Sequence, residues 1–258
     1  MTQEQRLDYL IDRLRRERAD FRRIEVPTEI EDKRQLLRGL MNVRPPRPVS
    51  EEFLAVQDEY LRARQTERGV TRLADLAPVQ EGLYLWRGDI TTLEVDAIVN
   101  AANSRMLGCF VPCHACIDNV IHTYAGIQLR LACAAQMEGQ GDEPTGSARI
   151  TPAYNLPSRY VLHTVGPIIT DRVGATEREQ LASCYRACLA LAAENGLRSI
   201  AFCCISTGVF HFPNDLAAEI AVQTVRDYRR EHPDQIEVIF NVFTEKDHAL
   251  YRTLLAAD

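Results

Sequence analysis

The sequence of 258 residues lacks any apolar run near the ~18 residues that a membrane span requires. Its first residues, MTQEQRLDYLIDRLRRERADFRR, are charged throughout and lack the apolar core of a secretory signal. These two absences predict a cytoplasmic protein that interacts with no membrane.

Strong positive charge is also absent. The formal net charge is -6 and no long basic run occurs, which argues against nucleic acid as a partner. Neither a G-x-G-x-x-G sequence nor a Walker sequence is present, so standard dinucleotide and NTPase sites lose support. An anionic ligand would have to be held by backbone N–H groups and helix N-termini.

Residues 1–75 are predicted to form a helical extension. Apolar residues recur at helical spacing in RLDYLIDRLRRE and again in EIEDKRQLLRGLMNV. The prolines of VRPPRPVS then interrupt the pattern, and Ser50 follows as the expected N-cap of a third helix, EEFLAVQDEYLRARQTE. The extension could be a packing element, a lid or a partner surface, and the residues leave these roles open.

Residues 76–258 differ, because short apolar runs alternate there with helical stretches. The predicted strands lie within residues 83–89, 97–103, 148–154, 160–167, 200–206 and 236–243. The predicted helices cover residues 116–137, 176–196, 214–232 and 245–257. This alternation predicts an α/β fold with three α/β/α layers and a mixed, largely parallel central sheet. Ligands of such sheets usually bind beyond the carboxyl ends of the strands.

Two polar side chains end predicted strands at this edge, and a third begins a helix. Asp89 follows the first strand and Asn103 follows the second, and each is either a structural cap or a ligand contact. Asp118 is expected in the first turn of a helix, as a cap or as a general base beside an anion site. His122, one turn further along, is expected in the core or behind the site.

The segment CISTGVFHF (204–212) follows the fifth predicted strand. Its Ser206, Thr207 and Gly208 offer hydroxyl groups, bare backbone N–H groups and conformational freedom. A loop of this composition can cradle a phosphate without any net positive charge.

The chain contains eight cysteines, and a cytoplasmic protein keeps most of its cysteines reduced. Five lie in apolar or helix-like stretches and are expected to be small buried hydrophobes: Cys133, Cys184, Cys188, Cys203 and Cys204. The other three share the short segment GCFVPCHAC (108–116) with one histidine.

Cys109, His114 and Cys116 form the spacing C-x4-H-x-C, which predicts a metal site. In an extended segment His114 and Cys116 point to one side, and a turn around Pro112 would bring Cys109 back toward them. Two thiolates and one imidazole suit Zn²⁺, and three protein ligands leave the fourth position open, as in catalytic zinc sites. Cys113 is the candidate for a fourth ligand, which would make the zinc structural.

Other chemistries use the same cysteines. Cys109, Cys113 and Cys116 also spell C-x3-C-x2-C, which is similar to the iron–sulfur motif of radical S-adenosylmethionine enzymes. A cysteine beside a histidine at a helix N-terminus has a lowered pKa and can act as a nucleophile. A structural disulfide fits a reducing compartment poorly.

Four segments, taken together and in order, resemble the macrodomain family, which binds ADP-ribose. They are GDITTLEVDAIVNAANSRMLG, IDNVIHTYAG, TGSARITPAYNLPSRYVLHTVGP and IAFCCISTGVFHFP. The resemblance is strongest to the ADP-ribose hydrolase branch, in which a tripeptide similar to Ile117-Asp118-Asn119 opens the helix. That branch normally has a run of glycines where this chain has CFVPCHAC. The CFVPCHAC segment and the N-terminal extension both resemble features of a smaller branch, the zinc-containing macrodomains of bacteria and fungi.

The resemblance implies a role for each candidate residue. Asp89 and Ile90 would contact adenine, Asn103 would face the distal ribose, and Asp118 matches the acidic residue that acts near that ribose. The diphosphate would lie between residues 108–116, beginning at Gly108, and a second loop made of Ser206, Thr207, Gly208, Val209 and Phe210. One Zn²⁺ per chain would be held by Cys109, His114 and Cys116.

The implied function is a zinc-dependent hydrolase that removes mono-ADP-ribose from modified proteins, with Asn103 and Asp118 as its catalytic residues. The alternative is a non-catalytic module that reads ADP-ribose, and a third reading is a purely structural zinc. In some microbes the zinc branch accompanies a sirtuin-type ADP-ribosyltransferase and a lipoyl carrier protein. The implied partners are therefore ADP-ribose, a mono-ADP-ribosylated protein and a lipoyl carrier protein.

Overall fold

The structure, a computed structural model, describes residues 1–233 and 235–256. Three helices come first, as predicted: α1 (Gln3–Arg16), α2 (Ile30–Val43) and α3 (Glu51–Arg68). Among the residues that the structure describes, no helix is both long enough and apolar enough to cross a membrane.

The three N-terminal helices share an apolar core. The Thr2 side chain accepts from the Gln5 N–H and the Gln5 side chain accepts from the Thr2 N–H, which forms a capping box at the start of α1. Ser50 Oγ accepts from the Phe53 N–H at 3.2 Å, so the predicted N-cap of α3 is confirmed. The helices bury their apolar faces against one another, through Leu7, Leu10, Ile11, Leu14, Leu37, Leu40, Met41, Phe53, Tyr60 and Leu61.

After α3, the described residues contain a central sheet of seven strands. Their order is β2 (Pro78–Gln80), β3 (Leu83–Arg87), β9 (Glu237–Val242), β8 (Ser199–Phe202), β5 (Ala97–Ala101), β7 (Tyr160–Thr164) and β6 (Ala148–Pro152). The edge strands β2 and β6 are antiparallel to their neighbours, and the inner strands are parallel. The short strands β1 (Thr71–Arg72) and β4 (Leu93–Glu94) pair separately. The predicted mixed, largely parallel sheet is confirmed.

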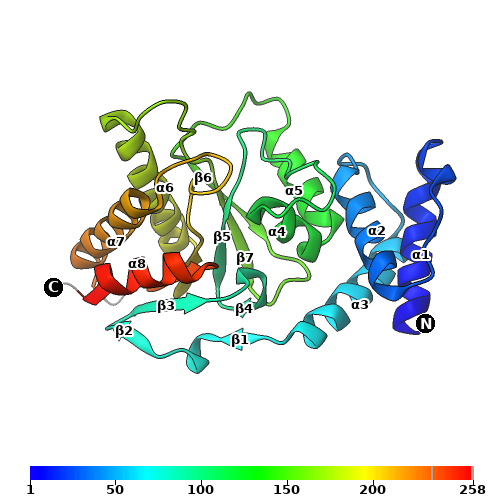
Figure 1. The fold of residues 1–258 in the computed structure, drawn as a ribbon, viewed down its shortest axis with the longest axis horizontal. Coiled ribbons are helices and arrows are strands. Elements are labelled where there is room, and N and C mark those ends of the chain that lie inside the picture. Colours follow the sequence, from blue (N-terminus) through cyan, green and yellow to red (C-terminus); the bar gives the residue numbers. More distant parts are fainter. Residues whose placement is uncertain (234, 257–258) are drawn as a thin grey trace.

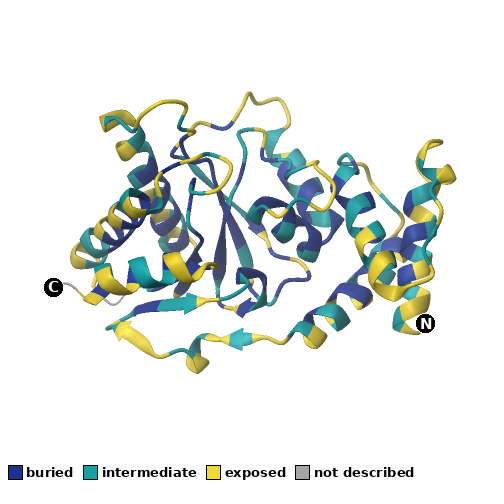
Figure 2. Ribbon diagram, in the orientation of Figure 1, coloured by how far each residue is buried: buried dark blue, intermediate teal, exposed yellow. Residues whose placement is uncertain are grey.

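Helices cover both faces of this sheet, which gives the predicted three layers. Figure 1 shows α4 (Ile117–Ala125) and α5 (Ile127–Met137) on one side, with the N-terminal helices beyond them. On the other side lie α6 (Ala175–Glu194), α7 (Asn214–Glu231) and α8 (Glu245–Ala256). The central strands β9, β8, β5 and β7 are almost wholly buried, as Figure 2 shows, because they lie between the two layers of helices, whereas β3 is only partly buried. Residue 257, the end of the last predicted helix, lies outside the described residues.

The single helix predicted over residues 116–137 is wrong, because Gly126 divides it. Gly126 has φ +95°, which is incompatible with a continuous helix, and its N–H donates to the His122 carbonyl at the end of α4. The Ile127 N–H, at the start of α5, donates to Gln57 Oε1 of α3 at 3.0 Å. Ile127 also belongs to the apolar core of the N-terminal helices, so the break is where those helices dock.

The cysteines outside residues 108–116 are largely where they were expected. Cys133, Cys184, Cys188 and Cys203 are buried, as predicted. Cys204 is only partly buried because it lies beyond the end of β8, where its Sγ is 3.8 Å from the Asn241 carbonyl oxygen.

Candidate functional site

The carboxyl ends of β3, β9, β8 and β5 meet at one edge of the sheet, because these strands are parallel neighbours. Three of the segments singled out in the sequence leave from this edge. Asp89 follows β3, Asn103 and the cysteine loop (residues 108–116) follow β5, and residues 206–210 follow β8. The topology therefore gathers them at the place where sheets of this kind bind ligands.

The cysteine loop brings its three predicted metal ligands together. Cys109 Sγ lies 3.4 Å from His114 Nδ1, and the two sulfur atoms and one ring nitrogen of His114 are all within 4.8 Å of one another. The loop folds back through a turn in which the His114 N–H donates to the Val111 carbonyl at 3.3 Å. Two sulfur atoms and one imidazole nitrogen form a donor set that Zn²⁺ prefers, so these residues fit that metal.

Cys113 points away from this group. Its backbone has φ 54°, its N–H donates to Asn42 Oδ1 at 2.9 Å, and its Sγ lies 3.4 Å from the Gln35 carbonyl oxygen of α2. Both an iron–sulfur site and a closed four-ligand zinc site would need the Cys113 sulfur among the ligands. The arrangement therefore favours the three-ligand reading.

Cys116 is also the N-cap of α4. Its Sγ accepts from the Asn119 N–H at 3.4 Å. Burial raises the pKa of the Cys116 thiol to about 12, although the Asn119 N–H acts in the opposite direction. Without a cation the thiol is protonated at neutral pH, which disfavours a free nucleophilic thiolate. A metal ion would displace that proton on binding.

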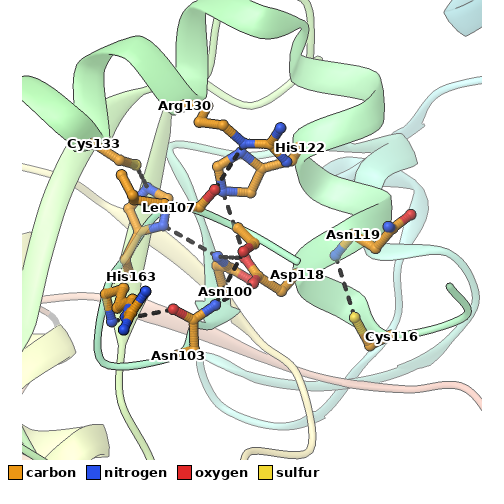
Figure 3. A network of polar contacts seen from close by, with 12 residues as sticks. Asn100, Asn103, Leu107, Cys116, Asp118, Asn119, His122, Arg130, Cys133 and His163 are labelled. Carbon is orange, nitrogen blue, oxygen red and sulfur yellow. Dashed lines mark hydrogen bonds and ion pairs between the residues drawn. The ribbon is translucent and has the colours of Figure 1, made fainter. Parts of the chain in front are cut away.

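Asp118 lies in the first turn of α4, as predicted, and its buried carboxylate is beside Asn103. Asn100 Nδ2 donates to Asp118 Oδ1 at 2.8 Å, and Asn103 Nδ2 donates to Asp118 Oδ2 at 3.3 Å (Figure 3). Burial raises the pKa of Asp118 to about 6, and the two amides and Arg130 lower it. At neutral pH this carboxylate is mostly ionised, yet its pKa is close enough to pH 7 for general-base catalysis.

A buried chain of polar side chains supports Asp118, and the sequence analysis missed it. Asn100 Nδ2 also lies 3.1 Å from His163 Nδ1, and His163 Nε2 lies 2.8 Å from Thr151 Oγ1. Burial lowers the pKa of His163 to about 3, so the ring is neutral. Because an amide nitrogen only donates, we assign the ring proton to Nε2. Asn and His in otherwise apolar buried strands were the available signal.

His122 lies behind Asp118, as expected for a core residue. Burial lowers the pKa of His122, so it is neutral, and its Nε2 lies 3.5 Å from Asp118 Oδ1 without a well-formed hydrogen bond. The His122 ring also leaves no room for a side chain at Gly108, which has φ +79°. A Cβ at that position would lie 2.8 Å from His122 Cδ2. The cysteine loop can start as it does only with glycine there.

His122, Cys133 and His163 form a second buried group of potential metal ligands, with donor atoms within 4.8 Å of one another. His163 already uses both ring nitrogens in the contacts to Asn100 and Thr151. Burial raises the pKa of the Cys133 thiol to about 12. We interpret this group as an uncharged part of the core.

The 206–210 loop closes on itself. The Phe212 N–H donates to the Ser206 carbonyl at 3.0 Å, and Thr207 Oγ1 donates to the Cys204 carbonyl at 2.9 Å. The Ile169 N–H donates to the Phe210 carbonyl, which ties the loop to the segment after β7. Among the described residues, four backbone amides in this loop have no hydrogen-bond acceptor, those of Ser206, Gly208, Val209 and Phe210, and the last three are consecutive. Such N–H groups can hold a phosphate.

Asp89 is held by the N-terminal helices. Arg68, the last residue of α3, forms an ion pair with Asp89 Oδ2, and its guanidinium carbon lies 3.6 Å from the centre of the Tyr124 ring. Asp89 Oδ1 accepts from the Thr91 N–H at 3.0 Å, so Asp89 also caps a short turn. The Ile90 side chain is buried, which leaves its backbone as the part able to reach a ligand.

Phe243 was also missed by the sequence analysis. It follows β9 at the same edge of the sheet and is 79% exposed. A large aromatic side chain in that position offers a flat apolar surface to a ligand. Its place at the end of an apolar strand, where a polar residue is more usual, was the available signal.

Comparison with known proteins identifies the fold family. A protein from Treponema medium named Protein-ADP-ribose hydrolase is 56% identical, over 99% of this chain and 100% of its own. Residues 99–221 match the Macro domain family. The chain belongs to the Macro domain family. A Staphylococcus aureus (strain MRSA252) protein, also named Protein-ADP-ribose hydrolase, is 53% identical to this macrodomain protein over 98% of the chain and 96% of its own.

A solved macrodomain has the same architecture. The Trypanosoma brucei macrodomain in complex with ADP-ribose has a TM-score of 0.65 and 34% identity, and the match covers 84% of this chain and 94% of that one. The macrodomain fold that the sequence motifs predicted is therefore confirmed.

Proposed function

We propose that this macrodomain protein is a zinc-dependent hydrolase that removes mono-ADP-ribose from modified proteins. The observation that carries the proposal is the position of the zinc-type donor set. Cys116, one of its three members, caps the same helix whose first turn holds Asp118. The names of the Treponema medium and Staphylococcus aureus relatives support the hydrolase reaction. The donor set supports the dependence on zinc.

Cys109, His114 and Cys116 would hold the metal. When bound, zinc would polarise a ribose oxygen or lower the pKa of a water molecule at the bond to the protein side chain. The three protein ligands leave room for such a fourth, exchangeable ligand. Cys113, whose sulfur faces α2, takes no part.

Asp118 and Asn103 would act on the ribose. Asp118 accepts hydrogen bonds from two amides, which hold the carboxylate in one orientation for an attacking group to approach. Its raised pKa lets it take a proton from that group more readily than an ordinary aspartate would. Asn103 is only partly buried, and its side chain would fix the ribose hydroxyls beside Asp118.

The remainder of ADP-ribose would be bound along the same sheet edge. The free amides of Gly208, Val209 and Phe210 would meet the diphosphate, together with the start of the cysteine loop. Asp89 would accept from the amino group of adenine, and the exposed ring of Phe243 would lie against the base. The resemblance to the zinc branch makes a lipoyl carrier protein the candidate for the modified partner.

The decisive test is to incubate the purified protein with a mono-ADP-ribosylated protein, with and without a zinc chelator. We expect release of ADP-ribose, its loss on chelation and its return with added zinc. Elemental analysis should find about one zinc per chain. Binding of ADP-ribose without release would instead assign a reader module, and release that chelation leaves unchanged would make the zinc structural or absent.

The role of Asp118 needs its own variant. Asp118→Asn keeps the size and one acceptor oxygen but removes the base, so hydrolysis should fall by roughly 100-fold or more, the usual contribution of acid–base catalysis. Calorimetry with ADP-ribose should show that binding persists. Full activity in Asp118→Asn would transfer the proton-accepting role to another group.

A further inference from the structure

The N-terminal helix α2 contacts the cysteine loop through Arg38. One guanidinium nitrogen of Arg38 donates to the His114 carbonyl at 2.8 Å and to Asn119 Oδ1 at 2.9 Å, and Nε reaches the same Asn119 oxygen at 3.3 Å. The first of these contacts fixes the backbone of a proposed metal ligand. The second fixes the first turn of α4.

Asn42, one turn further along α2, holds the other side of the turn. Its Oδ1 accepts from the Cys113 N–H at 2.9 Å, and its Nδ2 donates to Thr123 Oγ1 at 3.0 Å. Thr123 Oγ1 in turn donates to the Asn119 carbonyl at 2.7 Å. Asn42 is 1% exposed, and the two bonds that involve Thr123 are buried, so a missing partner there would be costly.

Asn119 connects these contacts to the sulfur of Cys116. Its N–H donates to Cys116 Sγ at 3.4 Å, and its Nδ2 donates to the Val111 carbonyl at 2.9 Å. A displacement of Arg38 would therefore loosen the turn at the His114 carbonyl directly and at the Val111 carbonyl through Asn119. The three neighbouring backbone positions of this turn, at Val111, Cys113 and His114, are each held by a named side chain.

Arg38 is unlike the preceding arginine of the same helix. Arg34 pairs with the carboxylates of Glu31 in the same helix and Glu67 in α3, which are ordinary surface ion pairs. Arg38 donates instead to neutral oxygens of the cysteine loop and α4, and in the described part of the chain no carboxylate pairs with it. A planar guanidinium can serve two such acceptors at once, which a lysine ammonium does less well.

We propose that Arg38 and Asn42 are positioning residues for the metal loop, so that the N-terminal helical segment completes the catalytic site. This rests on the proposed zinc-dependent function. Groups that orient metal ligands from behind commonly change metal affinity or activity by about 10–100-fold when they are removed. The N-terminal helices are then required for the chemistry at the distal ribose, whereas the amides of the 206–210 loop do not depend on them.

The experiment compares Arg38→Met, Arg38→Lys and Asn42→Ala with the control Arg34→Met, all in the full-length chain. The rate of zinc release to a chelator should rise about tenfold or more in Arg38→Met and Asn42→Ala, and less in Arg38→Lys. Hydrolysis should lose kcat while KM changes little, and calorimetric binding of ADP-ribose should persist. Arg34→Met should keep the wild-type zinc release rate and kcat.

A second measurement tests the positioning role in protein from which zinc has been removed. Amide hydrogen exchange of residues 109–116 in chelated protein should be faster in Arg38→Met than in wild type, with exchange of residues 206–212 unchanged. Wild-type exchange in this loop, or wild-type zinc release and kcat in Arg38→Met, would overturn the positioning role. A wild-type protein that neither binds zinc nor hydrolyses would instead overturn the proposed function, and the exchange result would still decide whether α2 orders the loop.

Discussion

The cysteine loop and the 206–210 loop leave neighbouring parallel strands, but they are held in different ways. The 206–210 loop is held by backbone hydrogen bonds, one between Phe212 and Ser206 beside it in sequence and one to Ile169 in the segment after β7. The cysteine loop depends on side chains from other elements, Arg38 and Asn42 of α2 and Asn119 of α4. The conformation of the 206–210 loop therefore rests on backbone bonds within the α/β fold, whereas that of the cysteine loop depends on how α2 docks.

Asp89, in the proposed adenine-binding part of the site, also depends on the N-terminal helices. Its carboxylate is oriented by Arg68 of α3, as the cysteine loop is oriented by α2. Of the three parts of the proposed site, Asp89 and the cysteine loop are thus held by the N-terminal helices, and the 206–210 loop is not. The N-terminal helical segment is a structural component of the site as well as a neighbour of it.

The largest effect is expected from the metal ligands. His114→Ala and Cys116→Ala should lose zinc and lower kcat/KM by roughly 100-fold or more, since a bound metal contributes several kcal/mol to charge stabilisation. Cys113→Ser is the matched control and should keep zinc and most activity, because its sulfur faces α2. If Cys113→Ser strips the metal as completely as Cys116→Ala, the site has four ligands and its zinc is structural.

The next largest effect is expected at Gly108, where the cysteine loop begins. Gly108→Ala would place a Cβ 2.8 Å from the His122 ring at a backbone φ of +79°. The free energy of unfolding should fall by about 1–3 kcal/mol, the usual cost of strained backbone, and zinc should be released faster. Chemical denaturation measures the first effect and chelator competition the second. Wild-type stability would show that the His122 ring moves aside without cost.

A smaller effect, on binding alone, is expected at Asp89. Asp89→Ala should weaken ADP-ribose binding by ~1–3 kcal/mol, because a polar group of the ligand loses its partner. Arg68→Met is the control that removes the ion pair but keeps the carboxylate. Calorimetry on both variants shows whether the carboxylate itself or its orientation by Arg68 matters. Unchanged affinity in a folded Asp89→Ala protein would remove Asp89 from the ligand site.

The smallest effect is expected at Gly208, in the 206–210 loop. An added Cβ would meet no protein atom within 4 Å, and Gly208 does not have positive φ. Gly208→Ala should therefore change the free energy of unfolding by less than about 0.5 kcal/mol. ADP-ribose affinity should fall by about 1 kcal/mol, the net value of a typical hydrogen bond, because the Cβ points into open space beside the free amides. Calorimetry showing wild-type affinity would place the diphosphate elsewhere.

Much of the fold could be predicted from the sequence, because its pattern is local. The apolar strands, the helical stretches and the Ser50 cap all depend on spacing within a few residues, and apart from the helix over residues 116–137 they lie where they were predicted. The break at Gly126 could not be predicted in this way. At this break the acceptor for the Ile127 N–H is Gln57 Oε1, seventy positions earlier in the chain, and local spacing carries no sign of that contact.

The candidate site likewise has a part that local sequence predicted and a part that it did not. The spacing of Cys109, His114 and Cys116 and the turn between them predicted a group of three potential metal ligands, which the fold brings together. The support of Asp118 by Asn100 and His163 could not be predicted, because their strands become neighbours only when the sheet forms.

The sequence by itself determined which elements form, which residue types are available for metal and phosphate, and which family the chain resembles. Only the tertiary structure decided how those residues are oriented. Arg38 lies 76 positions before His114, and a contact over that distance exists only after α2 has packed against α4. Local preferences are set by neighbouring residues, whereas the buried hydrogen bonds around the cysteine loop form only when distant helices exclude water together.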